Sequence, residues 1–124
     1  PAGVRFQVCI PTPLAVISNF FVPSDVRRIW PVYERKLLEE ISEVARAIPH
    51  DDLAIQLDIA SELTTFLEVP ELKKEYPIEE LVNGIARVGN SVPADVELGL
   101  HLCYGDPGHK HVIEPRDTAN MVEL

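Results

Sequence analysis

Three strand-like segments, centred near residues 7, 55 and 99 and separated by helix-like segments, constrain this chain more than any other feature. Connections of this length suit parallel strands, because parallel neighbours cannot be joined by a tight turn and need a crossover, usually a helix. The order β-α-β-α-β-α therefore predicts an α/β fold built on a parallel sheet. We expect each crossover to be right-handed.

Each of the three strands ends at a rigid or polar segment. Residues 4–10 (VRFQVCI) alternate apolar and polar side chains until Pro11-Thr12-Pro13 ends the strand. Residues 53–57 are mostly apolar and lead directly into Asp58. Residues 96–104 (VELGLHLCY) form the third strand, and a Gly-Asp-Pro-Gly turn follows it.

The longest predicted helix lies between Ser24 and Ile48. Ser24 can cap its first turn, and apolar residues recur along one face at steps of three and four. These apolar residues are Val26, Ile29, Tyr33, Leu37, Ile41, Val44 and Ile48. Pro31 interrupts the pattern, so the helix can also begin there, with residues 24–30 in a separate turn. The Pro-His-Asp-Asp run at 49–52 ends the helix.

Two further helices are expected. The first begins at Pro77 and ends before Gly89, while the second opens at residues 114–117 (EPRD). Residues 63–76 form an irregular acidic segment. The chain starts at Pro1, without an initiator methionine, and closes inside the last helix, so we expect residues 1–124 to be one partial domain, truncated at both ends.

The composition narrows the class of partner. The formal net charge is −9 and Lys and Arg are not clustered, which argues against nucleic acid or an anionic membrane, because phosphate binding needs basic patches. No segment approaches the roughly 20 apolar residues that span a bilayer, and there is no signal-peptide pattern. The two cysteines, Cys9 and Cys103, are too few for a disulfide scaffold, so we expect a cytoplasmic protein.

The predicted topology gathers the chemistry at one edge. Parallel strands place their carboxyl ends together, where α/β enzymes build their sites, and this edge would hold Thr12, Asp58, His101 and Cys103. His101 and Cys103 are two residues apart on a strand, so their side chains point to the same face. Imidazole and thiolate are both zinc ligands, although a zinc site needs three or four. The alternative is that both residues simply pack in the core.

Two other polar groups allow a functional and a structural interpretation. Asp58 ends an apolar strand, where a carboxylate either meets something positive or caps the following segment. His109 and His111, beside Asp106 and Glu114, suggest a second metal site or a solvated loop. Neither a phosphate-binding glycine loop nor a G-x-S-x-G nucleophile motif occurs, so nucleotide binding and serine-based hydrolysis are disfavoured.

Two motifs resemble the catalytic half of cobalamin-independent methionine synthase and the superfamily it shares with uroporphyrinogen decarboxylase. His101 and Cys103, followed by Tyr104, match an H-x-C-Y strand end that supplies two zinc ligands. Gln56-Leu57-Asp58 matches a Q-x-D strand end upstream, although Ile59-Ala60 follow Asp58 where the synthase has Glu-Pro. The family's remaining glutamate and cysteine ligands would lie beyond Leu124.

The resemblance implies that the chain is a segment of a (β/α)₈ (TIM) barrel, covering about three of its eight strands. It implies a zinc cofactor, held in part by His101 and Cys103, that activates a small-molecule thiol substrate for transfer of a methyl group from a methyl donor. Asp58 would hold the amino-acid end of the substrate as a catalytic and substrate-binding residue. We also expect Thr12 and Tyr104 to contact the substrate.

Two other functions remain open. One is a metal-independent decarboxylase-like lyase of the same superfamily, with Asp58 facing the substrate and His101 as proton donor. The other is a non-catalytic binding module in which His101 and Cys103 are core residues. Three strands of a barrel would leave sheet edges and apolar faces uncovered, so we also expect self-association.

Overall fold

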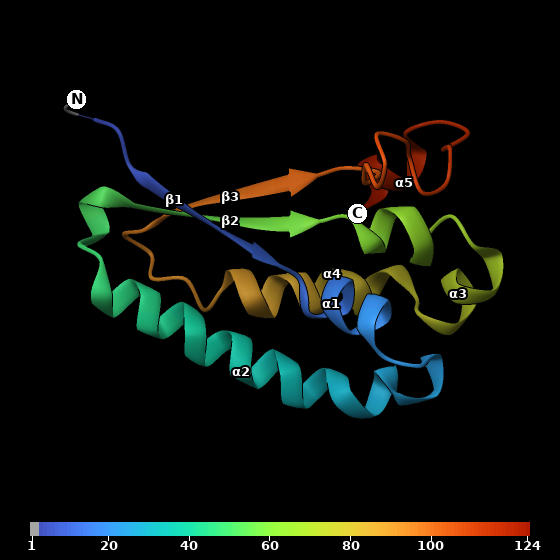
Figure 1. Ribbon diagram of the computed structural model, residues 1–124, viewed down its shortest axis with the longest axis horizontal. Helices are drawn as coiled ribbons and strands as arrows, with labels where there is room; N and C mark the ends of the chain where they lie inside the picture. The colour runs from blue at the N-terminus through green and yellow to red at the C-terminus, as the bar shows by residue number, and fades with distance from the viewer. Residues whose placement is uncertain (1–2) are drawn as a thin grey trace.

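A computed structural model, which describes residues 3–124, has a three-stranded parallel sheet in the order β1-β2-β3. The strands are β1 (Phe6–Pro11), β2 (Leu53–Ile59) and β3 (Glu97–Leu102), and all three point toward the same end of the molecule (Figure 1). Phe6 pairs with Leu53 and Ala54 pairs with Glu97, which sets the register of both strand pairs. The predicted α/β fold with a parallel sheet is confirmed.

Helices connect the strands and cover one side of the sheet. The long crossover helices α2 (Val26–Ala47) and α4 (Ile78–Gly89) lie on the same side (Figure 1). Shorter helices are α1 (Pro13–Phe20), α3 (Pro70–Glu75) and α5 (Ala119–Glu123). Single helical turns are η1 (Pro23–Asp25), η2 (His50–Asp52) and η3 (Glu62–Phe66), of which η3 is a π-helix.

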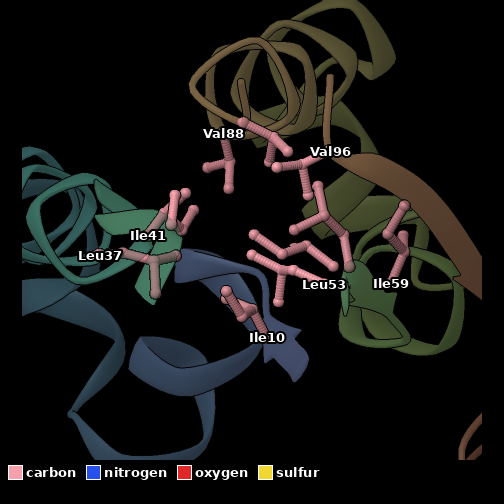
Figure 2. Close-up of a cluster of buried hydrophobic side chains, with 11 residues drawn as sticks. Ile10, Leu37, Ile41, Leu53, Ile59, Val88 and Val96 are labelled. Carbon is pink, nitrogen blue, oxygen red and sulfur yellow. The ribbon is translucent and has the colours of Figure 1, made fainter. Parts of the chain in front are cut away.

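The main core forms between the helices and the side of the sheet that they cover. Along β2, Leu53, Ile55, Leu57 and Ile59 are buried while the residues between them are only half-buried. These β2 side chains belong to one cluster with Ile10 of β1, Leu37 and Ile41 of α2, and Val88 of α4. Figure 2 shows Leu53 and Ile59 of β2 in this cluster. Each such aliphatic side chain contributes about 1.5–3 kcal/mol when removed from water.

A second apolar cluster supports the loops at the carboxyl ends of the strands. It joins α1, α2, η3 and α4 through ten buried residues, which are Leu14, Ile17, Val26, Trp30, Leu63, Phe66, Leu67, Tyr76, Leu81 and Tyr104. Trp30 stacks on Tyr76, and Phe66 meets the same ring edge-on. The segments that follow β1, β2 and β3 are therefore tied to one packed unit.

The long helix differs from both predictions of its start. It begins at Val26 and continues through Pro31, so the interpretation that it starts at Pro31 is wrong. The preceding turn is η1, and the helix cap is Asp25, without a side-chain hydrogen bond, instead of Ser24. Burial of Val26 and Trp30 in the second cluster holds the first turns helical and outweighs the backbone hydrogen bond that Pro31 removes.

Short helices fill segments that the sequence pattern left irregular. Residues 13–20 form α1, whose first turn is capped by Thr12, and residues 62–75 contain η3 and α3 instead of an irregular segment. The last helix begins at Ala119, later than residues 114–117. The first strand starts at Phe6 instead of Val4. By contrast, α4 begins just after Pro77 and includes Gly89 as its final residue, close to the prediction.

The outer strand β3 keeps an apolar row in contact with solvent. Leu98, Leu100 and Leu102 pair with Ile55, Leu57 and Ile59, so they point to the helix-covered side, yet all three remain exposed. Among residues 3–124, none of the helices is both long and apolar enough to cross a membrane.

Candidate functional site

The side of the sheet opposite α2 and α4 carries a row of polar side chains. Partners in a parallel register point to the same side of the sheet. The β2 residues Gln56 and Asp58 therefore share this side with Cys9 of β1 and His101 of β3, their register partners or near neighbours. We call this side, with Gln7, Cys9, Gln56, Asp58 and His101, the polar face.

Asp58 and His101 form a hydrogen-bonded pair at the carboxyl end of the polar face. They are direct register partners, and His101 Nδ1 lies 3.1 Å from Asp58 Oδ1. The imidazole is 50% exposed and the carboxylate 35% exposed, so both can be reached from solvent. The prediction that these two residues share one edge of the sheet is confirmed.

Two glutamines continue this pair across the polar face. Gln56 donates from Nε2 to Asp58 Oδ1 at 2.8 Å, and Gln7 donates from Nε2 to Gln56 Oε1 at 3.0 Å. The Cys9 Sγ atom accepts from Gln7 Nε2 at 3.3 Å. Sequence reasoning missed Gln7 and Cys9 as site residues, although their alternation with Val8 and Ile10 placed them opposite the core.

Cys103 lies just beyond β3. Its backbone N–H donates to the carbonyl of Ile59 at 3.2 Å, which continues the ladder between β3 and β2 by one more bond. Cys103 and His101 both line an open hollow of about 450 Å³ at the end of the strand. The two predicted zinc ligands therefore face one space.

The loop after Cys103 forms the other wall of this hollow. Asp106, His109 and His111 line it together with Lys110. Gly105, Gly108 and His109 all have positive φ angles, of 67°, 67° and 62°, which is uncommon for a histidine. His111 Nδ1 lies 3.0 Å from Glu114 Oε2. The loop thus brings imidazoles to the same hollow as His101 and Cys103.

These groups do not form a complete metal site. Over the described part of the chain, no three His, Cys, Asp or Glu side chains come close enough together to hold one ion. His101 and Cys103 fit two positions of a zinc site by the chemistry of their donor atoms. The contact between His101 Nδ1 and Asp58 is also of the kind that orients a metal-binding imidazole.

The two other predicted substrate residues are buried. Thr12 is 1% exposed, and its hydroxyl accepts from the Ala15 N–H at 3.3 Å as the cap of α1. Tyr104 is 7% exposed, and its hydroxyl donates to the Asp117 carbonyl at 3.4 Å. Both residues help to shape the strand ends, and their contact with a substrate stays a prediction.

Glu62 is a buried acidic group that the sequence analysis did not select. It is 2% exposed, and its Oε2 atom has no hydrogen-bond partner within residues 3–124. Burial raises the pKa of Glu62, and a hydrogen bond with Thr12 opposes this only in part. Its position four residues after Asp58, in a segment whose other residues are uncharged, was the available signal.

Two further pairs with shifted pKa values lie away from the polar face. His50 has a raised pKa because it is hydrogen-bonded to Asp95, and Glu34 has a lowered pKa because Arg87 donates to it. The His50–Asp95 pair lies at the amino-terminal end of the sheet, and the Glu34–Arg87 pair joins α2 and α4.

Comparisons with protein-family models, with characterised proteins and with solved structures found no match to this chain.

Proposed function

We propose that this chain is a segment of a zinc-dependent methyltransferase, similar to cobalamin-independent methionine synthase, that transfers a methyl group to a thiol. The observation that carries the proposal is the Asp58–His101 pair beside Cys103 at the carboxyl end of a parallel sheet. A histidine and a cysteine on one hollow, with the histidine oriented by a carboxylate, make up half of a catalytic zinc site.

The topology supports a (β/α)₈ barrel as the parent fold. The strands follow chain order, β1-β2-β3, and both long crossover helices lie on one side of the sheet. One half of a doubly wound sheet has the same arrangement, but its second face is covered by helices as well and would need apolar side chains where this chain has the polar face. The uncovered polar face would then line the barrel interior, with Asp58, His101 and Cys103 at the end where barrel enzymes carry their sites.

In this proposal His101 and Cys103 would hold the zinc ion together with further ligands from other residues. When bound, zinc stabilises the deprotonated, nucleophilic form of a thiol at neutral pH. In this arrangement Asp58 accepts a hydrogen bond from the N–H at His101 Nδ1, which leaves Nε2 free of Asp58. We retain Asp58 as a substrate-orienting group as well, because a third of its side chain is exposed beside the hollow.

Zinc titration of the chain against a chromophoric chelator tests the ligand assignment. We expect one zinc ion per chain, with at least a tenfold loss of affinity in both His101→Ala and Cys103→Ala. Cys9→Ala is the matched control, because Cys9 is an exposed cysteine on the first strand, and it should bind zinc as the unaltered chain does. Unchanged affinity in the His101 and Cys103 variants would reject the assignment.

One observation favours a metal-independent lyase as the second candidate. Among the described residues, no third His, Cys, Asp or Glu side chain comes close enough to complete a metal site, whereas the Asp58–His101 pair is complete and could move a proton without a metal. This candidate predicts decarboxylation activity that survives strong chelation and is lost in His101→Ala.

A further inference from the structure

We infer that Gln56 is a positioning residue that sets which nitrogen of His101 carries the proton. Gln56 lies between two hydrogen bonds on the polar face: it accepts from Gln7 at 3.0 Å and donates to Asp58 at 2.8 Å. Asp58 in turn lies 3.1 Å from His101 Nδ1. These three bonds form one chain across all three strands.

The direction of this chain follows from the groups that form it. An amide oxygen only accepts and an amide nitrogen only donates. Because the Gln7 amide nitrogen occupies Gln56 Oε1, Gln56 must present its own nitrogen to Asp58. An ionised carboxylate only accepts, so the remaining bond on Asp58 Oδ1 must be donated by His101 Nδ1.

The consequence for His101 is a fixed tautomer. With its proton on Nδ1, a neutral imidazole carries its lone pair on Nε2, the nitrogen that is free of Asp58. This is the form that ligates a metal through Nε2. Without the Gln56 amide, Asp58 loses the donor that holds its carboxylate beside His101 Nδ1, so the carboxylate can turn away and no longer confines the ring to one tautomer. The link to zinc depends on the proposed function, whereas the tautomer itself does not.

Histidine nitrogen-15 spectra of the metal-free chain test the inference at a pH of about 8, above the ordinary pKa of an imidazole. We expect His101 in the Nδ1-protonated form, and a mixture of both tautomers in Gln56→Met, which removes the amide but keeps the side-chain length. Three other histidines, His50, His109 and His111, act as internal references and should not change. Predominantly Nε2-protonated His101 in the unaltered chain, or an unchanged tautomer in the variant, would overturn the inference.

A second variant covers the case in which Gln56→Met does not fold. Gln7→Met leaves Gln56 in place but removes the donor that holds its amide oxygen, so Gln56 positions Asp58 less firmly and a smaller shift of the His101 tautomer is expected. A purely structural role for the two glutamines would change the unfolding midpoint of both variants and leave the His101 tautomer as it is.

Zinc affinity separates this inference from the proposed function. We expect Gln56→Met to weaken zinc binding about tenfold, the usual loss when an imidazole loses its orienting network. An unaltered chain that binds no zinc but holds the Nδ1 tautomer would reject the proposed function and support the positioning role. If Gln56→Met shifts the His101 tautomer but leaves the zinc affinity unchanged, the claim that this positioning helps His101 to bind zinc is wrong.

Discussion

Glu62 places a carboxyl group where a charge is costly. Its side chain is almost fully buried, one oxygen has no partner within residues 3–124, and burial raises its pKa. A group whose pKa is raised on folding binds its proton more tightly in the folded chain than in the unfolded chain. Its contribution to stability is therefore present at low pH and is lost as the pH rises through the folded-state pKa.

We expect Glu62→Gln to stabilise the chain at neutral and higher pH, because glutamine resembles the neutral carboxylic acid but cannot ionise. The gain should be on the order of 1 kcal/mol and should shrink at acidic pH. Urea unfolding at several pH values measures it. Glu43→Gln, at an exposed position of α2, is the control and should change little. A variant that is less stable than the unaltered chain at high pH would contradict this account.

At the scale of elements, α2 and α4 meet through a close contact between Trp30 and Gly84. A Cβ atom at Gly84 would lie 2.9 Å from Trp30 Cζ2, closer than real side chains approach. Arg87 of α4 also bonds Glu34 of α2 through two nitrogens, at 2.7 and 2.9 Å. The spacing of these two helices thus depends on a glycine, which is otherwise a poor helix former.

Gly84→Ala is therefore expected to destabilise the chain by about 1–3 kcal/mol, despite the higher helix propensity of alanine. Fluorescence of Trp30, the single tryptophan, reports both the unfolding and any shift of the ring. Gly89→Ala in the same helix meets its nearest atom at 3.5 Å, an ordinary contact, and should be near neutral. Equal effects of the two substitutions would contradict the close contact.

Pro31→Ala should have the opposite effect. Pro31 is exposed inside α2 and has no N–H to give to the carbonyl of Arg27, one turn earlier. Alanine restores this bond, and we expect a gain of about 1–3 kcal/mol in the free energy of unfolding. Val32→Ala, next to it and also exposed, serves as control in the same thermal unfolding experiment. A loss of stability in Pro31→Ala would mean that the proline favours this helix.

The elements that could be predicted from sequence were those with a strong periodic pattern. The mostly apolar run of β2 and the three-four spacing in α2 each extend over several residues, which was enough to predict a strand and a helix with one buried face. By contrast, α1 and η3 are short, and their apolar residues do not show which neighbour they meet. They are held by packing with Trp30, Phe66 and Tyr76, contacts between segments far apart in the chain.

The candidate site, like the fold, could be predicted from the sequence only in part. A parallel sheet required Asp58 and His101 to share one edge, and the same reasoning placed Cys103 beside them. The hydrogen bonds from Gln7 and Gln56 were not predictable, because they depend on the register between strands. The hollow also depends on the path of the loop at 105–111, because the sequence shows the turn at Gly105 and Gly108 but not where the loop places His109 and His111.

At the scale of the whole molecule, the outer strand β3 leaves an apolar surface uncovered. Leu98, Leu100 and Leu102 are 40%, 57% and 38% exposed on the side where helices cover β1 and β2. An apolar row beside an unpaired strand edge favours association with another chain.

We therefore expect the chain to self-associate at micromolar concentration, and Leu100→Lys to shift it toward the monomer in sedimentation velocity. Val122→Lys alters an exposed residue of α5, away from the sheet, and should leave the distribution as it is. A monodisperse monomer of the unaltered chain would contradict the expectation.

The most direct test of the central claim is the absorption spectrum of the chain with Co²⁺ in place of zinc. Ligation by Cys103 and His101 at one hollow predicts a sulfur-to-cobalt charge-transfer band that is lost in Cys103→Ser, while His101→Ala shifts or weakens the visible bands of the metal. A Co²⁺ spectrum without a sulfur band, or one that both variants leave unchanged, would contradict it.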